Sequence, residues 1–194
     1  SVVVAFEHSR HLPNAHVVQG DLLHPPVQRV FDLAFSVGVL HHLPDPAAGF
    51  QSLKGVVKKG GRVAFWVYGR ENNEWIVKFV DPVRKALTSR MPAEWLKPLS
   101  LPPSAALWGA IKLLYKPRDD GKGPPLPYGD YFAAMHSFPL DEIHSIVFDQ
   151  LVTPVAYYLS GDEVRHWFDR GFEDVNVRWH GQYSWTGHAR ISAS

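Results

Sequence analysis

The fold is decided by the stretch FDLAFSVGVLHHLPDP, residues 31–46. Its first seven residues form a largely apolar run, which is followed by Gly38 and the His41–His42 pair. Such a run is typical of a buried parallel strand, and a parallel strand delivers the residues after it to a ligand crevice at its carboxyl end. The Asp45–Pro46 pair is then placed to begin a helix.

A helix and a second strand complete this unit. Apolar residues near helical spacing predict a helix over residues 47–57, and the sequence KKGG, residues 58–61, ends it because glycine permits a left-handed turn. RVAFWVY, residues 62–68, is a second buried strand. Strand, helix and strand at this spacing predict a parallel βαβ unit.

The segment before this unit is less clear. Residues 1–10 contain three valines and suit either a strand or a short helix. Residues 16–19 predict a short strand that Gly20 and Asp21 close, and the successive prolines at 25 and 26 predict a loop after it.

Residues 70–154 break the alternation of strand and helix. They contain apolar helical pieces rich in Trp and Phe, and prolines at 82, 92, 98, 102 and 103 are expected to divide them into short helices. We interpret residues 70–154 as an inserted helical subdomain, and residues 1–69 with 155–194 as a partial α/β core. The aromatic side chains of the insertion favour a core of its own over a substrate cage.

The last part of the chain predicts a helix and a hairpin. Ser160 is placed to cap a helix that carries Val164, Trp167 and Phe168 and stops at Gly171. Two alternating runs joined by HGQY, residues 180–183, then predict an antiparallel hairpin.

Composition narrows the class of protein. The chain has 194 residues, a formal net charge of +1 and no cysteine. This balance provides no overall field for nucleic acid or an anionic membrane surface, and it excludes thiolate chemistry. No apolar run is long enough to span a membrane, so we expect a cytoplasmic chain.

The order of these pieces resembles the class I S-adenosylmethionine-dependent methyltransferases, in particular the methyltransferase type 11 group. The matching text is VVQGD, FDLAFSVGVLHHLPDP, KKGGRVAFWVYG and YYLSGDEVRHWFDRGFEDVNV, about half of the chain. The resemblance implies a Rossmann-like, doubly wound α/β sheet with a helical insertion and a C-terminal antiparallel hairpin. It also implies S-adenosyl-L-methionine as the cofactor.

The resemblance further assigns cofactor-binding residues. Asp21 would accept a hydrogen bond from the adenine amine, with Leu22 beside the ring. The methionine part of the cofactor would lie along Ser36, Val37 and Gly38. From the residues alone, Asp21 is equally suited to a turn in which it bonds its own backbone.

His41 would face the cofactor or the substrate, and it is our candidate for a catalytic residue. A metal site on His41 and His42 is not expected, because adjacent side chains diverge and no third ligand stands at a useful spacing. One of the two histidines could act as a base or line a pocket, and simple packing is the alternative.

Two features of the family are missing. No glycine-rich loop and no ribose-binding acidic residue precede His16. We therefore expect an N-terminally truncated form of the fold, in which residues 31–37 form an unprotected sheet edge and residues 1–10 are helical.

Two classes of function remain open at this stage. The first is methyl transfer to a small-molecule acceptor, with residues 70–154 as lid and substrate selector. The second is a degenerate methyltransferase-like domain that binds a protein partner without catalysis. A nucleic-acid substrate is disfavoured by the balanced charge, and the sequence predicts no oligomeric state.

Overall fold

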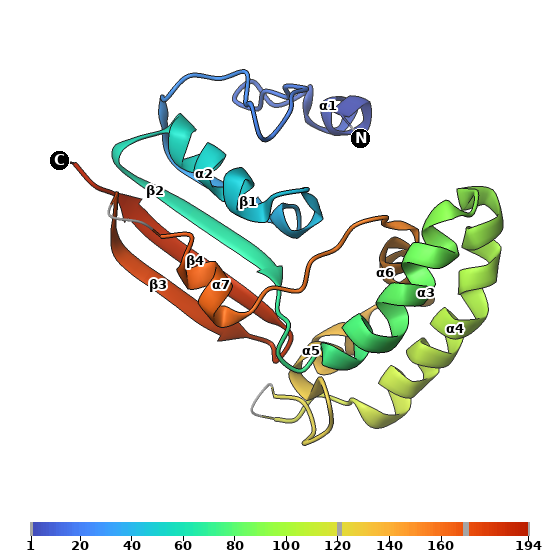
Figure 1. Cartoon of the computed structure of the whole chain (residues 1–194). Helices are drawn as coiled ribbons and strands as arrows, with labels where there is room; N and C mark the ends of the chain where they lie inside the picture. Colours follow the sequence, from blue (N-terminus) through green and yellow to red (C-terminus); the bar gives the residue numbers. More distant parts are fainter. Residues whose placement is uncertain (1, 120–121, 169–170, 194) are drawn as a thin grey trace.

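The computed structural model describes residues 2–119, 122–168 and 171–193. Figure 1 shows a sheet at one end of the molecule and, beside it, a group of helices formed by the middle of the chain. The sheet and these helices are described in turn.

The sheet has four strands, β1 (Phe31–Val37), β2 (Val57–Tyr68), β3 (Phe172–His180) and β4 (Ser184–Ile191), in the order β1-β2-β4-β3. β1 and β2 are parallel, whereas β4 pairs antiparallel with both β2 and β3. The Rossmann-like α/β class and the C-terminal hairpin predicted from the sequence are therefore confirmed.

The connection between the parallel strands follows the sequence closely. After β1 the chain forms the short 3-10 helix η1 (Leu40–His42) and then α2 (Pro46–Val56). The Asp45 carboxylate accepts a hydrogen bond from the Ala48 amide (2.9 Å). This cap satisfies one of the free amides at the start of the helix, as the Asp-Pro pair predicted.

The KKGG segment differs from its prediction. β2 already begins at Val57, where it pairs with Phe31, and the register then shifts so that Leu33 pairs with Arg62. The chain still turns at Gly60, which has a φ of +77°. Residues 58–61 thus bulge out within the strand, because the glycine permits the turn without ending the pairing.

The core is an aromatic cluster under one face of the sheet. Phe50 of α2 is fully buried, and its ring centroid lies 5.4 Å from that of Phe65 and 5.5 Å from those of Trp167 and Phe172. Helices α2 and α7 (Gly161–Arg165) both pack on this face (Figure 1). The cluster thereby joins the βαβ unit to the hairpin.

α7 is shorter than predicted. Its Ser160 cap is present as a full capping box with Glu163, but the helix ends at Arg165 rather than near Gly171. The Trp167 and Phe168 amides bond to carbonyls three residues back, and this tighter turn directs both rings into the aromatic cluster. Residues 169–170 of the predicted helix lie outside the described part of the chain.

β1 is an edge strand of the described sheet, as the sequence predicted. The β1 side chains Phe31, Leu33, Phe35 and Val37 are between 42% and 68% exposed. The helix predicted near the N-terminus is present as α1 (Val2–Ser9), although none of its described residues is buried; Ser1 lies outside the described residues.

The strand predicted over residues 16–19 is wrong. These residues have no regular structure, and Val18 is 62% exposed. The segment has no partner strand with which its backbone could pair, and an isolated strand is not stable in water.

The middle of the chain folds into helical elements with a small core of their own. These elements are η2 (Ile76–Val80), α3 (Asp81–Ala86), η3 (Thr88–Arg90), α4 (Ala93–Leu114), α5 (Gly129–Ala134), η4 (Met135–Ser137) and α6 (Leu140–Val152). Ile111, Met135 and Ile143 are buried at their centre. Below, residues 70–154 are called the insertion.

The prediction that prolines 98, 102 and 103 divide the insertion into short helices is wrong for α4. This helix runs unbroken for 22 residues through all three. The prolines lie on its exposed side, where carbonyls that lose a backbone donor can bond to water. On the buried side, the Ser104 hydroxyl donates to the Ser100 carbonyl at 2.6 Å.

Both ends of the insertion are fixed at the end of β2. The Gly69 amide donates to the Tyr183 carbonyl and the Arg70 amide to the Leu159 carbonyl, each at 2.9 Å. Gly69 and Leu159 also form a parallel bridge. The insertion therefore leaves and rejoins the core beside the carboxyl end of the parallel strand.

The position of the aromatic cluster predicts that two phenylalanines of the sheet differ strongly in their contribution to the free energy of unfolding. Phe65→Ala should lower the free energy of unfolding by about 3–5 kcal/mol, because it leaves a cavity in a closed core. Phe35→Ala, at a side chain that is 68% exposed, should change it by less than about 0.5 kcal/mol. Urea unfolding measures both, and equal losses would contradict this account of the core.

Candidate functional site

The segment that follows β1 forms the first part of the candidate site. Gly38 has a φ of +75°, a conformation that glycine adopts without strain, and its amide donates to the Trp66 carbonyl at 3.2 Å. This turn directs the chain from the end of β1 into η1. Of the residues predicted here, Ser36 and His41 are buried, whereas the Val37 side chain is 64% exposed.

Ser36 and His41 share an unusual property. His41 is fully buried and Ser36 is 6% exposed, yet neither the Ser36 hydroxyl nor either ring nitrogen of His41 has a hydrogen-bond partner among the described residues. Buried polar groups are nearly always paired, since leaving one unpaired costs about 1–3 kcal/mol. These three atoms are therefore candidates for contact with a polar ligand or an ordered water.

The surroundings of His41 keep its imidazole neutral. Its ring centroid lies 4.0 Å from that of Tyr68 and 4.2 Å from that of His42. Burial, with a smaller contribution from His42, lowers the pKa of His41 to about 3. The imidazole is therefore neutral near pH 7, and in this buried state it is a weaker base than an exposed histidine. The His42 ring is held elsewhere, by a 2.7 Å hydrogen bond to the Val155 carbonyl.

Asp21 and Leu22 lie in a separate turn. The Asp21 carboxylate accepts a hydrogen bond from the Leu23 amide (2.9 Å) and lies 3.0 Å from His24 Nδ1. These bonds, that to His24 first, lower the pKa of Asp21. Leu22 is half-buried against the core. Asp21 thus adopts the turn geometry that the sequence analysis left as the alternative, and its contact with adenine stays a prediction.

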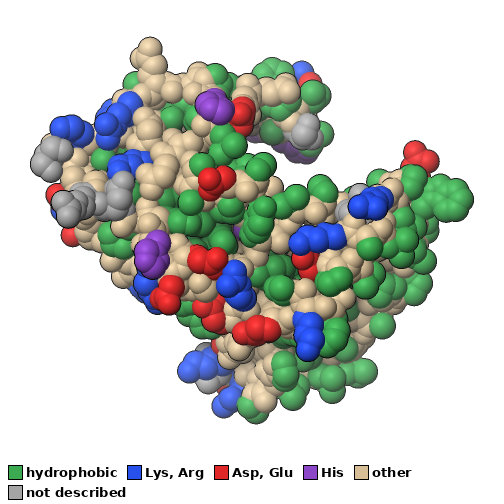
Figure 2. Space-filling view, viewed as in Figure 1, with side chains coloured by type: hydrophobic (Ala, Val, Ile, Leu, Met, Phe, Trp, Pro, Cys, Tyr) green, Lys and Arg blue, Asp and Glu red, His purple; other side chains and the backbone are tan. Residues whose placement is uncertain are grey.

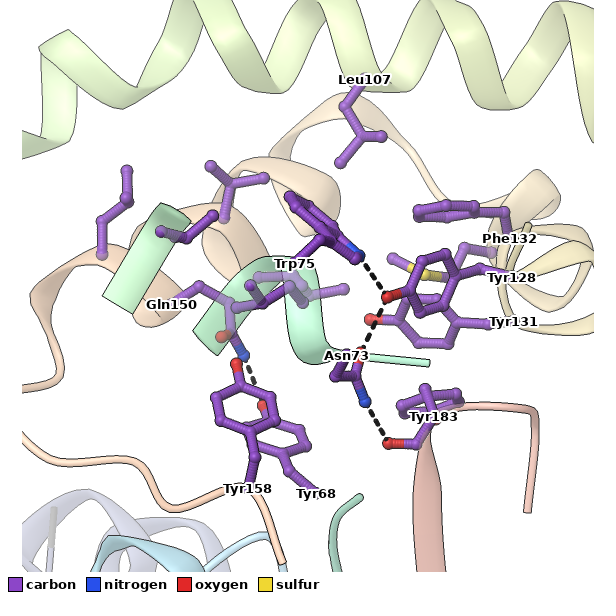
Figure 3. Close-up of a pocket in the computed structure, with 16 residues that line it drawn as sticks. Tyr68, Asn73, Trp75, Leu107, Tyr128, Tyr131, Phe132, Gln150, Tyr158 and Tyr183 are labelled. Carbon is purple, nitrogen blue, oxygen red and sulfur yellow. Dashed lines mark hydrogen bonds between the residues drawn. The ribbon is translucent and has the colours of Figure 1, made fainter. Parts of the chain in front are cut away.

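The second part of the site is a cavity between the end of β2 and the insertion. It has a volume of about 250 Å³, and Figure 3 shows its lining side chains converging from the insertion, from Tyr68 and from Tyr183. The lining is mainly apolar and aromatic: Tyr68, Asn73, Trp75, Ile76, Val80, Leu107, Tyr128, Tyr131, Phe132, Met135, Ile146, Val147, Gln150, Leu151, Tyr158 and Tyr183.

Polar groups hold one wall of this cavity in place. The Tyr128 hydroxyl accepts a hydrogen bond from Trp75 Nε1 (2.6 Å) and lies 2.9 Å from Asn73 Oδ1. Asn73 Nδ2 in turn donates to the Tyr183 carbonyl at 2.9 Å (Figure 3). Tyr128 has a φ of +57°, which is strained for an aromatic residue and requires such support. The wall is therefore preorganised rather than loosely packed.

Sequence reasoning missed this cavity. It interpreted the aromatic side chains of the insertion as core, which holds for Trp108 but not for Trp75, which lines the cavity. The sequence did carry one signal, the tyrosines at 128, 131, 157 and 158 that flank the return of the chain to the sheet and suit either an acceptor contact or a structural role; of these, Tyr128, Tyr131 and Tyr158 line the cavity.

Tyr68 joins the two parts of the site. It lines the cavity, contacts the His41 ring, and stacks on Tyr158 with a centroid distance of 5.6 Å. Burial raises the pKa of Tyr68 and raises that of Tyr158 to about 12. These phenols stay protonated near neutral pH, and the imidazole of His41 stays neutral, so this junction of the two parts of the site carries no charge from the three side chains.

Comparison with known families finds a match in the first third of the chain. Residues 3–65 match the model of a family described as a methyltransferase domain. The match covers β1, α2 and most of β2, and it confirms the resemblance to class I methyltransferases. It supports methyl transfer as the general reaction.

Solved structures with a similar backbone are distant in sequence. A possible exported protein from Bordetella parapertussis is 16% identical with a TM-score of 0.44, over 90% of this chain and 43% of that one. A protein from Thermotoga maritima, named a SAM-dependent methyltransferase and possible histamine N-methyltransferase, is 13% identical with a TM-score of 0.45, over 96% and 69%. The YcgJ protein from Bacillus subtilis is 17% identical with a TM-score of 0.41, over 100% and 78%.

The burial of His41 predicts a characteristic pH dependence of stability. The unfolded chain binds a proton at His41 below about pH 6.5, whereas the folded chain does not until about pH 3. The contribution of the neutral, buried His41 to the free energy of unfolding is therefore fully present above pH 6.5, and it decreases as the pH falls below this value. Between pH 8 and pH 5, wild type should lose about 2 kcal/mol more than His41→Phe. Urea unfolding at both pH values measures this, and parallel losses would refute it.

Proposed function

We propose that this chain carries out S-adenosylmethionine-dependent methyl transfer to a small apolar acceptor held in the cavity. The observation that carries the proposal is a pair of buried side chains near the carboxyl end of β1, Ser36 and His41, which have no hydrogen-bond partner among the described residues. The His41 ring contacts Tyr68, which lines the apolar cavity. Ligands of open α/β sheets bind at this end of the strands. The family match over residues 3–65 supports the same reaction.

The residues present fit such a cofactor in part. When bound, it would supply an electrophilic methyl group. Ser36, Val37 and Gly38 would lie along its methionine part, and the free Ser36 hydroxyl is available to hydrogen-bond with it. On the adenine side, Leu22 offers an apolar contact, while Asp21 would have to exchange its present bond to His24 for one to the ligand.

The acceptor would be oriented by the cavity wall. Methyl transfer depends mainly on alignment and on the exclusion of water, and the aromatic lining provides both. His41 remains the candidate for proton transfer, and because its ring contacts Tyr68 of the cavity wall, a proton from an acceptor hydroxyl or amine would reach it through Tyr68 or after Tyr68 moves aside. We assign the insertion the role of lid and substrate selector, and we place the reaction in the cytoplasm, which the lack of cysteine favours.

A non-catalytic binding module is the competing function. The observation that favours it is the closed turn at Asp21, which occupies the carboxylate that the cofactor would need. Cofactor binding decides between the two.

Substitution of Ser36 distinguishes a role of its hydroxyl in ligand binding from a role in the stability of the fold. Ser36→Ala should leave the free energy of unfolding unchanged or raise it, because the hydroxyl has no partner in the described fold. The same change should weaken binding of S-adenosylhomocysteine about tenfold, since one hydrogen bond is lost. Titration calorimetry and urea unfolding give the two values.

The control is Ser104→Ala, at a buried hydroxyl that donates to the Ser100 carbonyl. It should cost stability, about 1 kcal/mol, and leave ligand binding as in wild type. Failure of the wild-type chain to bind S-adenosylhomocysteine would refute cofactor use and favour the binding module.

The cavity can be tested with the two methionines of the chain. Met135 lines the cavity and Met91 does not. With carbon-13-labelled methionine methyl groups, titration of 2-naphthol, an apolar ring with one hydroxyl, should shift the Met135 resonance and leave that of Met91 in place. Equal shifts of both resonances, or none, would contradict an acceptor site in this cavity.

A further inference from the structure

The solvent side of α4 is apolar along its whole length. Trp95, Leu99, Pro102, Ala106 and Leu113 are all exposed, and their spacing of four, three, four and seven residues places them on one face of the helix. Trp95 is 70% exposed and Leu113 is 83% exposed. No charged residue of α4 falls within this face.

The opposite side of α4 is also apolar, because it forms part of the insertion's core. Leu96 and Ile111 are buried there, and α6 packs alongside (Figure 1). Of the three charged residues of the helix, Glu94 and Lys112 lie between the two sides, whereas Lys97 lies on the far side of the helix from the apolar row. A surface helix of a water-soluble domain normally carries polar residues on its solvent side. The apolar solvent side of α4 is therefore suited to contact with a further apolar surface outside the domain.

The neighbouring segment extends this surface. Phe79, Val83 and Leu87 recur every four residues through η2 and α3, and they are 62%, 54% and 57% exposed. Together with the apolar residues on the solvent side of α4 they are called the outer face. Figure 2 shows hydrophobic side chains gathered over the α3 and α4 region, with Lys and Arg side chains among them.

The segment that carries the outer face is rich in cations, although the chain as a whole is balanced and Asp119 and Asp120 follow this segment directly. Residues 76–118 contain eight of the 20 Lys and Arg residues and two of the 19 Asp and Glu residues. One of the two acids, Asp81, is buried and paired with Arg84. Exposed cations of this segment are Lys78, Lys85, Arg90, Lys97, Lys116 and Arg118.

We propose that the outer face lies on an anionic lipid surface. Apolar side chains with an exposed Trp enter the headgroup boundary, while the surrounding Lys and Arg side chains meet anionic headgroups. A second copy of the chain fits less well, because it would bring two sets of these cations together. The described helices include none that is long and apolar enough to cross a bilayer, so the contact is one of surface association.

The first test compares vesicles of phosphatidylcholine with vesicles that also contain phosphatidylglycerol, in a flotation assay with the whole chain. The chain should float with the anionic vesicles and stay with the soluble fraction in the presence of phosphatidylcholine alone. Leu99→Glu should weaken the partition about tenfold or more. Val175→Glu, at an exposed apolar residue of β3, is the matched control and should leave it unchanged.

The second test concerns charge. Lys116→Gln, at an exposed cation just after the end of α4, should weaken partition into the anionic vesicles about fivefold, and about 0.5 M salt should weaken it for all variants. Binding that is equal on both kinds of vesicle, or absent from both, would overturn the proposal. So would a dimer in solution that Leu99→Glu dissociates when the wild type does not bind vesicles, because the occupant would then be a second copy.

These experiments need neither cofactor nor methyl transfer. A chain that binds anionic vesicles but not S-adenosylhomocysteine would leave this inference standing and refute the proposed function. A chain that binds S-adenosylhomocysteine but not anionic vesicles would refute this inference and leave the proposed function standing.

Discussion

The parallel pairing of β1 with β2 is the constraint on which the rest of the structure depends. Because the two strands run in the same direction, their carboxyl ends meet, and the pairing of Val37 with Trp66 sets this meeting point. It brings the segment after β1, with Ser36 and His41, to Tyr68 at the end of β2. The insertion starts and ends there, so its cavity can open only next to the same residues.

The sequence predicted those features that local signals determine, and it did not predict those that depend on tertiary contacts. β1, α2 and the hairpin were predicted because local signals, such as the Asp45 cap and strand alternation, agree with their burial. The unbroken helix α4 was not predicted. Proline is tolerated in a helix where the carbonyls that lose a backbone donor face water, and the exposure of those carbonyls depends on the tertiary structure. Of the candidate site, the position of His41 just beyond the strand was predicted, but its complete burial was not, because burial depends on packing against Tyr68 and other distant residues. The cavity was not predicted either, because it is enclosed by residues as distant in sequence as Tyr68 and Tyr183.

α4 connects the two surfaces of the insertion. Leu107 lines the cavity on its inner side, while its outer side faces away from the core. A single helix therefore separates the proposed acceptor site from the proposed lipid contact. An apolar acceptor dissolved in a bilayer would have only the thickness of this helix layer to pass, whereas a water-soluble acceptor would gain nothing from the arrangement.

The bridge between Gly69 and Leu159 has a consequence for how such a protein can diversify. Seen from the sheet, the insertion is one long loop whose ends are neighbours, and the entropy of closing a loop grows only with the logarithm of its length. Helices between these anchors can be lengthened, lost or exchanged without shifting the register of β2 and β4. The half of the cavity that contacts an acceptor is thus a replaceable module on a constant frame, and new specificity can arise without rebuilding the fold.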